Sequence, residues 1–238
     1  REIAKEAAGA AEVKQRAPVM VILGNPPYSG HSQNRGDWIR GLLETYKKGC
    51  PELHKPGQAK WLSDDYVKFI RFAQWRIEQT GYGVLGFVTN NGYLDNPTFR
   101  GMGRALMEAF DDIFILDLHG SSKKKEQTPE GGKDENVFDI QQGVAIGIFV
   151  RRASTKNGST NVHHAHLWGL RESKYGWLWE HDVTSTKWRV LNPKEPEFLF
   201  TPRSSAGRAE YEAAWILRSI FSPGGDPAPG IVTTHDEF

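Results

Sequence analysis

A short apolar run that stops at two prolines constrains this chain more than any other stretch. Residues 19–23 read Val-Met-Val-Ile-Leu, and residues 24–28 read Gly-Asn-Pro-Pro-Tyr. A run of this length, rich in β-branched side chains and ended by glycine, predicts a strand buried on both faces of a sheet. Ligands of open α/β sheets bind beyond the carboxyl ends of strands, so the loop after Gly24 is expected to carry a site.

Strand-like and helix-like segments alternate downstream of this loop. The predicted helices cover 63–81 and 97–110, and the predicted strands cover 83–90, 113–118 and 142–150. Ser63 is expected to cap the first helix and Gly81 to end it. A strand, helix and strand in sequence form a right-handed crossover between parallel strands, so the pattern predicts an α/β fold with a partly parallel sheet.

Composition narrows the class of protein without naming a function. The chain has 238 residues, 38% hydrophobic and 25% charged, which is ordinary for a globular protein. Its formal net charge of +1 gives no overall basic field, so nucleic acid would have to be bound by local patches. With Cys50 as its single cysteine and no apolar run near the roughly 20 residues of a membrane span, the chain is expected in the cytoplasm. It starts at Arg1, and we interpret it as a fragment.

The loop Asn25-Pro26-Pro27-Tyr28 resembles the catalytic loop of S-adenosylmethionine-dependent amino-methyltransferases that act on adenine N6 in DNA. In that family the asparagine side-chain oxygen and the first proline carbonyl accept hydrogen bonds from the target amine. The resemblance therefore implies that Asn25 and Pro26 activate the amine and that Tyr28 stacks on a base flipped out of the duplex. The simpler alternative is a strand that ends in a tight loop.

Two phenylalanines extend the resemblance. Family members place an aromatic side chain near the start of the next helix against the adenine ring of the cofactor, which implies a cofactor contact by Phe69 together with Pro27. A phenylalanine just before the penultimate strand closes over the other face of the flipped base, and Phe138 stands at that place. The simpler alternatives are a sheet-packing stripe for Phe69 and an ordinary loop anchor for Phe138.

The resemblance covers roughly residues 17–152. It implies the C-terminal half of a Rossmann-like methyltransferase sheet, mostly parallel with an antiparallel last strand, and it is closest to large single-polypeptide restriction-modification enzymes. Helicase and nuclease parts of the same polypeptide and double-stranded DNA are the partners it implies. Family members with this order bind the cofactor's methionine part at a Gly-rich loop upstream, and residues 1–24 contain no such element. The isolated chain is therefore expected to bind S-adenosylmethionine poorly and to be inactive.

Three consecutive lysines, Lys123, Lys124 and Lys125, follow Gly120-Ser121-Ser122 in a predicted loop. We expect them to contact DNA phosphates. The alternative is a solvated charge run, since the acidic residues over 126–135 almost cancel its charge.

The character of the amino-acid sequence changes beyond residue 152. We predict a partial methyltransferase catalytic domain over 1–152, then a linker and a partial target-recognition region over 153–238, with a strand near 162–168 and a helix over 209–221. His163, His164 and His166 suggest zinc, but a strand puts only two of them on one face, and no Cys pair or acidic residue is close in sequence. No metal site is therefore expected.

Together these features indicate DNA adenine N6 methylation with S-adenosylmethionine in a restriction-modification system. Two alternatives stay open. Protein-glutamine methyltransferases use the same four-residue loop on an amide, although Phe138 and the tryptophan-rich basic tail favour DNA. The chain could instead be a non-catalytic DNA-binding remnant.

Overall fold

The structure is a computed structural model that describes residues 18–28, 32–55, 57–153 and 159–203, with a few positions before residue 10. The chain divides into two compact units, Arg1–Pro202 and Arg203–Phe238, and the account below concerns the first. The helix predicted over 209–221 lies outside the described residues. No described helix is both long enough and apolar enough to cross a membrane.

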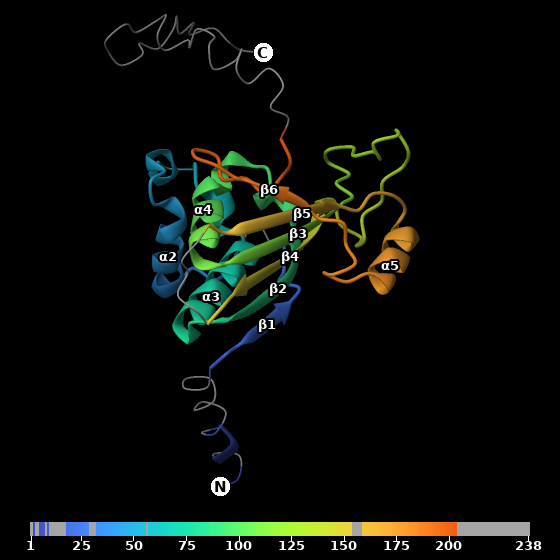
Figure 1. The fold of residues 1–238 in the computed structure, drawn as a ribbon. Helices are drawn as coiled ribbons and strands as arrows, with labels where there is room; N and C mark the ends of the chain where they lie inside the picture. Colours follow the sequence, from blue (N-terminus) through green and yellow to red (C-terminus); the bar gives the residue numbers. More distant parts are fainter. Residues whose placement is uncertain are drawn as a thin grey trace, which may run out of the picture. The chain divides into compact units, whose positions relative to one another are not determined.

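Six strands form one mixed sheet, with helices packed against it (Figure 1). The strands are β1 (Val21–Gly24), β2 (Gly83–Asn90), β3 (Asp112–His119), β4 (Val144–Arg151), β5 (Asn161–His166) and β6 (Arg189–Leu191). The α-helices are α2 (Asp37–Leu43), α3 (Asp65–Thr80), α4 (Arg100–Ala109) and α5 (Arg171–Glu180). Short 3-10 turns cover Glu44–Lys47, Pro51–His54, Lys60–Ser63, Asn91–Tyr93 and Pro97–Phe99.

The order of strands across the sheet is β1-β2-β4-β3-β5-β6. β1 pairs parallel to β2 and β3 parallel to β5, whereas β4 runs antiparallel between β2 and β3, and β6 antiparallel to β5. Four strands therefore point the same way, and the carboxyl ends of β1, β2, β3 and β5 lie at one edge. This arrangement confirms the expected α/β sheet, mostly parallel with an antiparallel strand. The strand predicted over 142–150 is the antiparallel β4, although β5 and β6 follow it in the chain.

Each face of the sheet has its own hydrophobic core. On the first face α3 and α4 pack on the sheet, with Ile70, Ile77 and Met102 fully buried. The second core lies around Leu116, Leu118, Val137 and Val144, and side chains of α5 pack against it. Figure 1 shows α2, α3 and α4 on one side of the sheet, and α5 with the loop between β3 and β4 on the other.

Two local expectations are wrong. Ser63 closes a 3-10 turn, and Asp64 rather than Ser63 is the N-cap of α3, although no cap bond from its side chain forms. β1 is not buried on both faces: Val21 is 59% and Leu23 74% exposed, because β1 is the end strand of the described sheet and pairs only with β2. The expected stop at Gly81 is confirmed, since this glycine has φ +89°.

Gly101 and Gly103, which resemble a phosphate-binding fragment in sequence, have a packing role. A Cβ on either glycine would collide with backbone, with the carbonyl of Tyr46 at one and of Phe198 at the other. α4 therefore packs directly against two backbone segments, and only glycine allows this approach.

The sheet continues beyond residue 152. β5 adds beside β3, and β6 beside β5, so the compact unit runs to Pro202. The strand predicted near 162–168 is confirmed as β5, and α5 joins β5 to β6. That residues 153–238 begin a target-recognition region stays a prediction.

Candidate functional site

The loop Asn25–Tyr28 leaves the sheet at the carboxyl end of β1. Asn25 and Pro27 are exposed, Pro26 is buried and Tyr28 is half-buried. The Tyr28 hydroxyl donates a hydrogen bond of 2.8 Å to Asn25 Oδ1, and the Tyr28 ring packs against both hydrophobic cores. Burial raises the pKa of Tyr28 to about 12, so its hydroxyl keeps its proton at neutral pH and orients the Asn25 amide.

This geometry leaves Asn25 able to accept a second hydrogen bond. An amide oxygen has two lone pairs, and Tyr28 occupies one of them. Proline has no backbone N–H. Pro26 and Pro27 therefore offer a substrate only hydrogen-bond acceptors, which are their carbonyl oxygens. The loop is thus an acceptor surface suited to an –NH₂ group.

Phe138 lies in a segment held by one buried asparagine. Asn136 Nδ2 donates to the carbonyls of Gly120 (3.0 Å) and Gln142 (2.6 Å), and Asn136 Oδ1 accepts from the Phe138 backbone N–H at 2.9 Å. The half-buried Phe138 ring packs against the second core, which Tyr28 also contacts. The structure therefore brings both predicted base-stacking residues to one hydrophobic cluster.

Helix α5 clamps the same segment from outside. Arg171 Nε donates to the Asn136 carbonyl at 2.7 Å, and its Nη2 donates to the Phe138 carbonyl at 3.1 Å. Lys174 is fully buried; its Nζ pairs with Asp134 Oδ1 at 2.8 Å and donates to the carbonyls of Leu118 and Glu135. Sequence reasoning missed this clamp: no helix was predicted over 171–180, and a lone lysine gives no signal for partners so far away in the chain.

The three predicted DNA-contacting lysines lie in the loop after β3, at the sheet edge that carries Asn25–Tyr28. Lys123 and Lys125 are exposed. Lys124 Nζ forms an ion pair of 2.8 Å with Asp95. Burial, the largest single cause, lowers the pKa of Lys124, but the bond to Asp95 and the charges of Asp95, Glu126 and Asp117 together raise it. Part of the expected positive charge is therefore compensated within the protein.

Phe69 is 46% exposed and lines a cavity of about 370 Å³ between α2 and α3. The cavity is lined by Gln33, Asn34, Trp38, Ile39, Asp65, Lys68, Phe69 and Phe72. Three aromatic rings and the Asp65 carboxylate suit a flat heterocycle that carries hydroxyl groups. Pro27 is exposed and does not line this cavity, so the structure does not join the two predicted cofactor contacts in one pocket.

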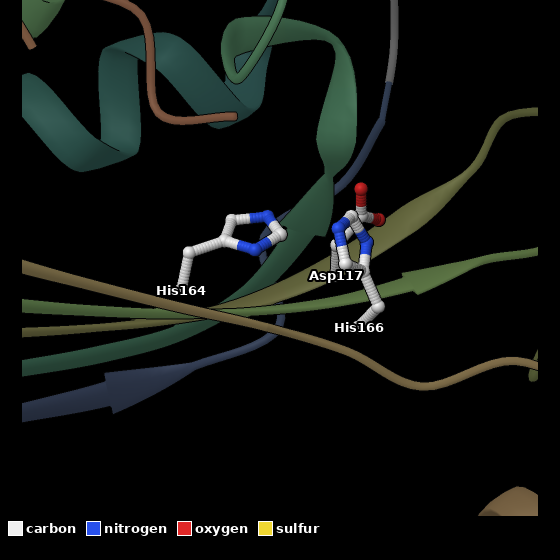
Figure 2. A group of neighbouring side chains, drawn as sticks. All are labelled: Asp117, His164 and His166. Carbon is white, nitrogen blue, oxygen red and sulfur yellow. The ribbon is translucent and has the colours of Figure 1, made fainter. Parts of the chain in front are cut away.

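The histidines of β5 separate onto two faces, as the strand pattern predicts. His163 stacks on Phe114 with ring centroids 4.5 Å apart, whereas His164 and His166 share the opposite face. Figure 2 shows Asp117 beside that second pair. The reasoning that excluded an acidic partner is therefore wrong, because pairing of β3 with β5 brings Asp117 from a distant part of the chain.

No family model and no curated protein matches the sequence. Solved structures do share the fold. The ATP-dependent Type ISP restriction-modification enzyme LlaBIII bound to DNA superposes with a TM-score of 0.67 at 25% identity, over 85% of this chain and 14% of that one. The DrdV–DNA complex gives 0.63 at 27% identity, over 80% and 19%.

A nuclease-deletion mutant of the Type ISP enzyme LlaGI, in complex with a DNA substrate mimic, gives a TM-score of 0.68 at 24% identity, over 82% of this chain and 19% of that one. The chain thus spans less than a fifth of the length of these three proteins. Its six-stranded α/β sheet resembles a part of Type ISP restriction-modification enzymes, which confirms the fold class expected from the sequence.

Proposed function

We propose that this chain is the catalytic part of a DNA adenine N6 methyltransferase, dependent on S-adenosylmethionine and belonging to a restriction-modification system. The observation that carries the proposal is the acceptor loop Asn25–Tyr28 at the carboxyl end of β1, with Phe138 packed on the same hydrophobic cluster as Tyr28. The likeness to a restriction-modification enzyme bound to DNA, and to a second protein in complex with DNA, supports DNA as the substrate.

The acceptor loop suits activation of an exocyclic amine. The lone pair of adenine N6 is delocalised into the ring, so the amine attacks only after hydrogen bonds make it more tetrahedral. Asn25 Oδ1, held by Tyr28, and the Pro26 carbonyl accept these two hydrogen bonds. Charge that develops on nitrogen is then stabilised by oxygens already in place, which is the efficient form of electrostatic catalysis.

The methyl donor needs a site for its adenosine part, and the cavity beside Phe69 fits it. Phe69, Phe72 and Trp38 offer ring faces, and Asp65 offers a carboxylate for ribose hydroxyls. S-adenosylmethionine, when bound, supplies an electrophilic methyl group. The residues of this chain hold the adenosine and orient the amine.

Tyr28 and Phe138 are proposed to hold the flipped adenine between their rings. A base that leaves the duplex loses its stacking, and each aromatic contact recovers about 1–3 kcal/mol. The clamp from Arg171 keeps the Phe138 backbone in place. Lys123 and Lys125, exposed on the neighbouring loop, are proposed to contact phosphates.

Methyl transfer by the complete gene product that contains this chain tests the proposal. With labelled S-adenosylmethionine and an adenine-containing duplex, Asn25→Ala should lower turnover at least ~10²-fold, the typical loss for one group of a preorganised polar site. DNA binding should persist. Asn192→Ala, which changes an exposed asparagine beyond β6, is the matched control and should keep full turnover.

Three outcomes would contradict the proposal. Near-full turnover of Asn25→Ala would remove this residue from the mechanism. Methylation of a glutamine peptide in preference to the duplex would assign the loop to a protein substrate. Duplex binding without methyl transfer by the unmodified gene product would indicate a DNA-binding remnant.

A further inference from the structure

Pairing of β3 with β5 gathers three metal-ligating side chains at the carboxyl edge of the sheet. Asp117 is the register partner of His166, and His164 lies two residues earlier on the same face of β5. One ligand atom from each of the three lies within 4.8 Å of those of the other two. Figure 2 shows the His166 ring beside the Asp117 carboxylate, with the His164 ring to the left of both.

His164 is the most unusual member of this group. Its side chain is 1% exposed, and neither ring nitrogen has a hydrogen-bond partner among the residues that the structure describes. Buried polar atoms are nearly always paired, so two unpaired nitrogens on one ring call for a ligand. A buried imidazole nitrogen that carries a free lone pair is a common ligand of metal ions.

The surroundings hold the other two side chains in place. Asp117 Oδ1 accepts hydrogen bonds of 3.0 Å from Asn91 Nδ2 and from the His119 backbone N–H. His119 Nε2 lies 2.8 Å from His166 Nδ1 and forms a ring-to-ring hydrogen bond. Metal-ligating histidines and carboxylates usually have such outer partners, which orient them.

The backbone has an unusual conformation at the end of β3, next to the three side chains. His119 has φ +53°, and the pairing of β3 with β4 shifts register between Asp117 and His119. Left-handed backbone is uncommon for a residue other than glycine, so the surrounding fold must favour it. The Trp168 ring stacked on His119 contributes to this preference.

We propose that Asp117, His164 and His166 bind one divalent transition-metal ion of the zinc class. Two imidazoles and a carboxylate are the donors that Zn²⁺ prefers, whereas Mg²⁺ and Ca²⁺ favour all-oxygen sites. Zinc ligands stand about 2.0–2.2 Å from the ion, so the three side chains must close in slightly, and exposed His166 can move. His166 also gives the ion a path from solvent.

Charges of both signs surround the site. Asp117 is a ligand, and Glu126 Oε1 lies 3.5 Å from Nδ1 of His119, the outer partner of His166. Arg189, the register partner of His164 in β6, and Lys124, which interacts electrostatically with Asp117 and Glu126, bring positive charge. In the order of the sheet β3 stands three places from β1, roughly 14 Å at the usual strand spacing, so this site is separate from the acceptor loop.

Zn²⁺ titration of the full chain after chelator treatment tests the proposal by calorimetry, and Co²⁺ absorption reports the ligand geometry. One ion per chain should bind, and Co²⁺ should give the intense visible bands of a tetrahedral site. His166→Ala and Asp117→Asn should each weaken binding at least ~100-fold, since loss of an outer-shell partner already costs 10–100-fold. His163→Ala, on the opposite face of the same strand, is the matched control and should bind normally.

Thermal unfolding distinguishes a variant that no longer binds the metal ion from a variant that no longer folds. Exposed His166 can be replaced without opening the core, so His166→Ala should unfold at the temperature of the unmodified chain in chelator and should lose the rise caused by Zn²⁺. His164→Leu should lose the same rise. Absence of stoichiometric binding, an undiminished affinity in His166→Ala, or an equal loss in His163→Ala would overturn the proposal.

Discussion

The hydrogen bond between Tyr28 and Asn25 gives the acceptor loop its direction. A free asparagine side chain at an exposed loop would rotate, and its oxygen and nitrogen would exchange places. The Tyr28 hydroxyl can bind only the oxygen when it donates, so the bond selects one orientation. The ring that is proposed to stack on the base therefore also sets the amide that is proposed to activate it.

Substitution of Phe138 distinguishes a role in base flipping from a role as an ordinary loop anchor. If Tyr28 and Phe138 hold opposite faces of an extruded adenine, Phe138→Ala should weaken the flipped state by roughly 1–3 kcal/mol. Turnover by the complete gene product should then fall more on a paired target than on a mismatched one, where extrusion costs less. Fluorescence of 2-aminopurine at the target position should report the change, because aromatic stacking quenches it.

The mismatched duplex is the internal control for this comparison. Equal losses of turnover on paired and mismatched targets would make Phe138 an anchor of the loop. Tyr28→Ala should act in the same direction as Phe138→Ala, with a further loss from the freed Asn25 side chain.

Helix α5 fixes the Phe138 segment through a buried ion pair. The side chains of Lys174 and Asp134 are both fully buried, and the Asp134 carboxylate also accepts hydrogen bonds from the backbone N–H groups of Gly120 and Gly169. Lys174→Met removes the cation but leaves those two donors, so we expect a loss of about 3 kcal/mol in unfolding free energy, near the low end for a broken buried pair. Urea unfolding followed by circular dichroism measures it.

Lys133→Ala is the matched control for Lys174→Met. Lys133 pairs with Glu135 in the same segment, but its side chain is 74% exposed, so a change of at most about 1 kcal/mol is expected. A Lys174→Met protein as stable as the unmodified chain would show that α5 does not hold the segment.

Local patterns in the sequence were sufficient for the central elements. β2, β3 and β4 are continuous apolar runs, and their observed bounds lie within two residues of those predicted. β1 was placed correctly, but its burial was not, because the run 19–23 gives its apolar content and not its position in the sheet. Ser63 and Asp64 are both good capping residues, so composition alone could not choose between them.

Contacts between residues far apart in the chain could not be predicted from the sequence. Asn25–Tyr28 and Phe138 were found by motif, and the common core that they contact was seen only in the structure. Asp117 and His166 are 49 residues apart and become neighbours only when β5 adds beside β3. No periodicity in the β5 segment specifies which strand it will join.

Buried tyrosines couple the stability of the whole compact unit to alkaline pH. Tyr46, Tyr66 and Tyr93 are at most 2% exposed, and burial is the main cause that raises the pKa of each; it also raises that of half-buried Tyr28. Above pH ~10 an unfolded tyrosine loses its proton while the folded one keeps it, so the folded state binds more protons. The free energy of unfolding must then fall as pH rises.

The expected slope is about 1.4 kcal/mol per pH unit for each tyrosine that stays protonated only in the folded state. With four such residues, a domain of ordinary stability, about 5–15 kcal/mol, should unfold within a few pH units above 10. Urea unfolding at stepwise increasing pH, with phenolate absorbance as the second signal, measures this.

Tyr46→Phe should reduce the slope by the contribution of about one tyrosine. Loss of the 2.8 Å hydrogen bond from Tyr46 to Gln74 also lowers the starting stability. Tyr82→Phe, at a 38% exposed side chain, is the matched control. A slope that is the same in Tyr46→Phe and in the unmodified chain would mean that the Tyr46 phenol reaches solvent in the folded state.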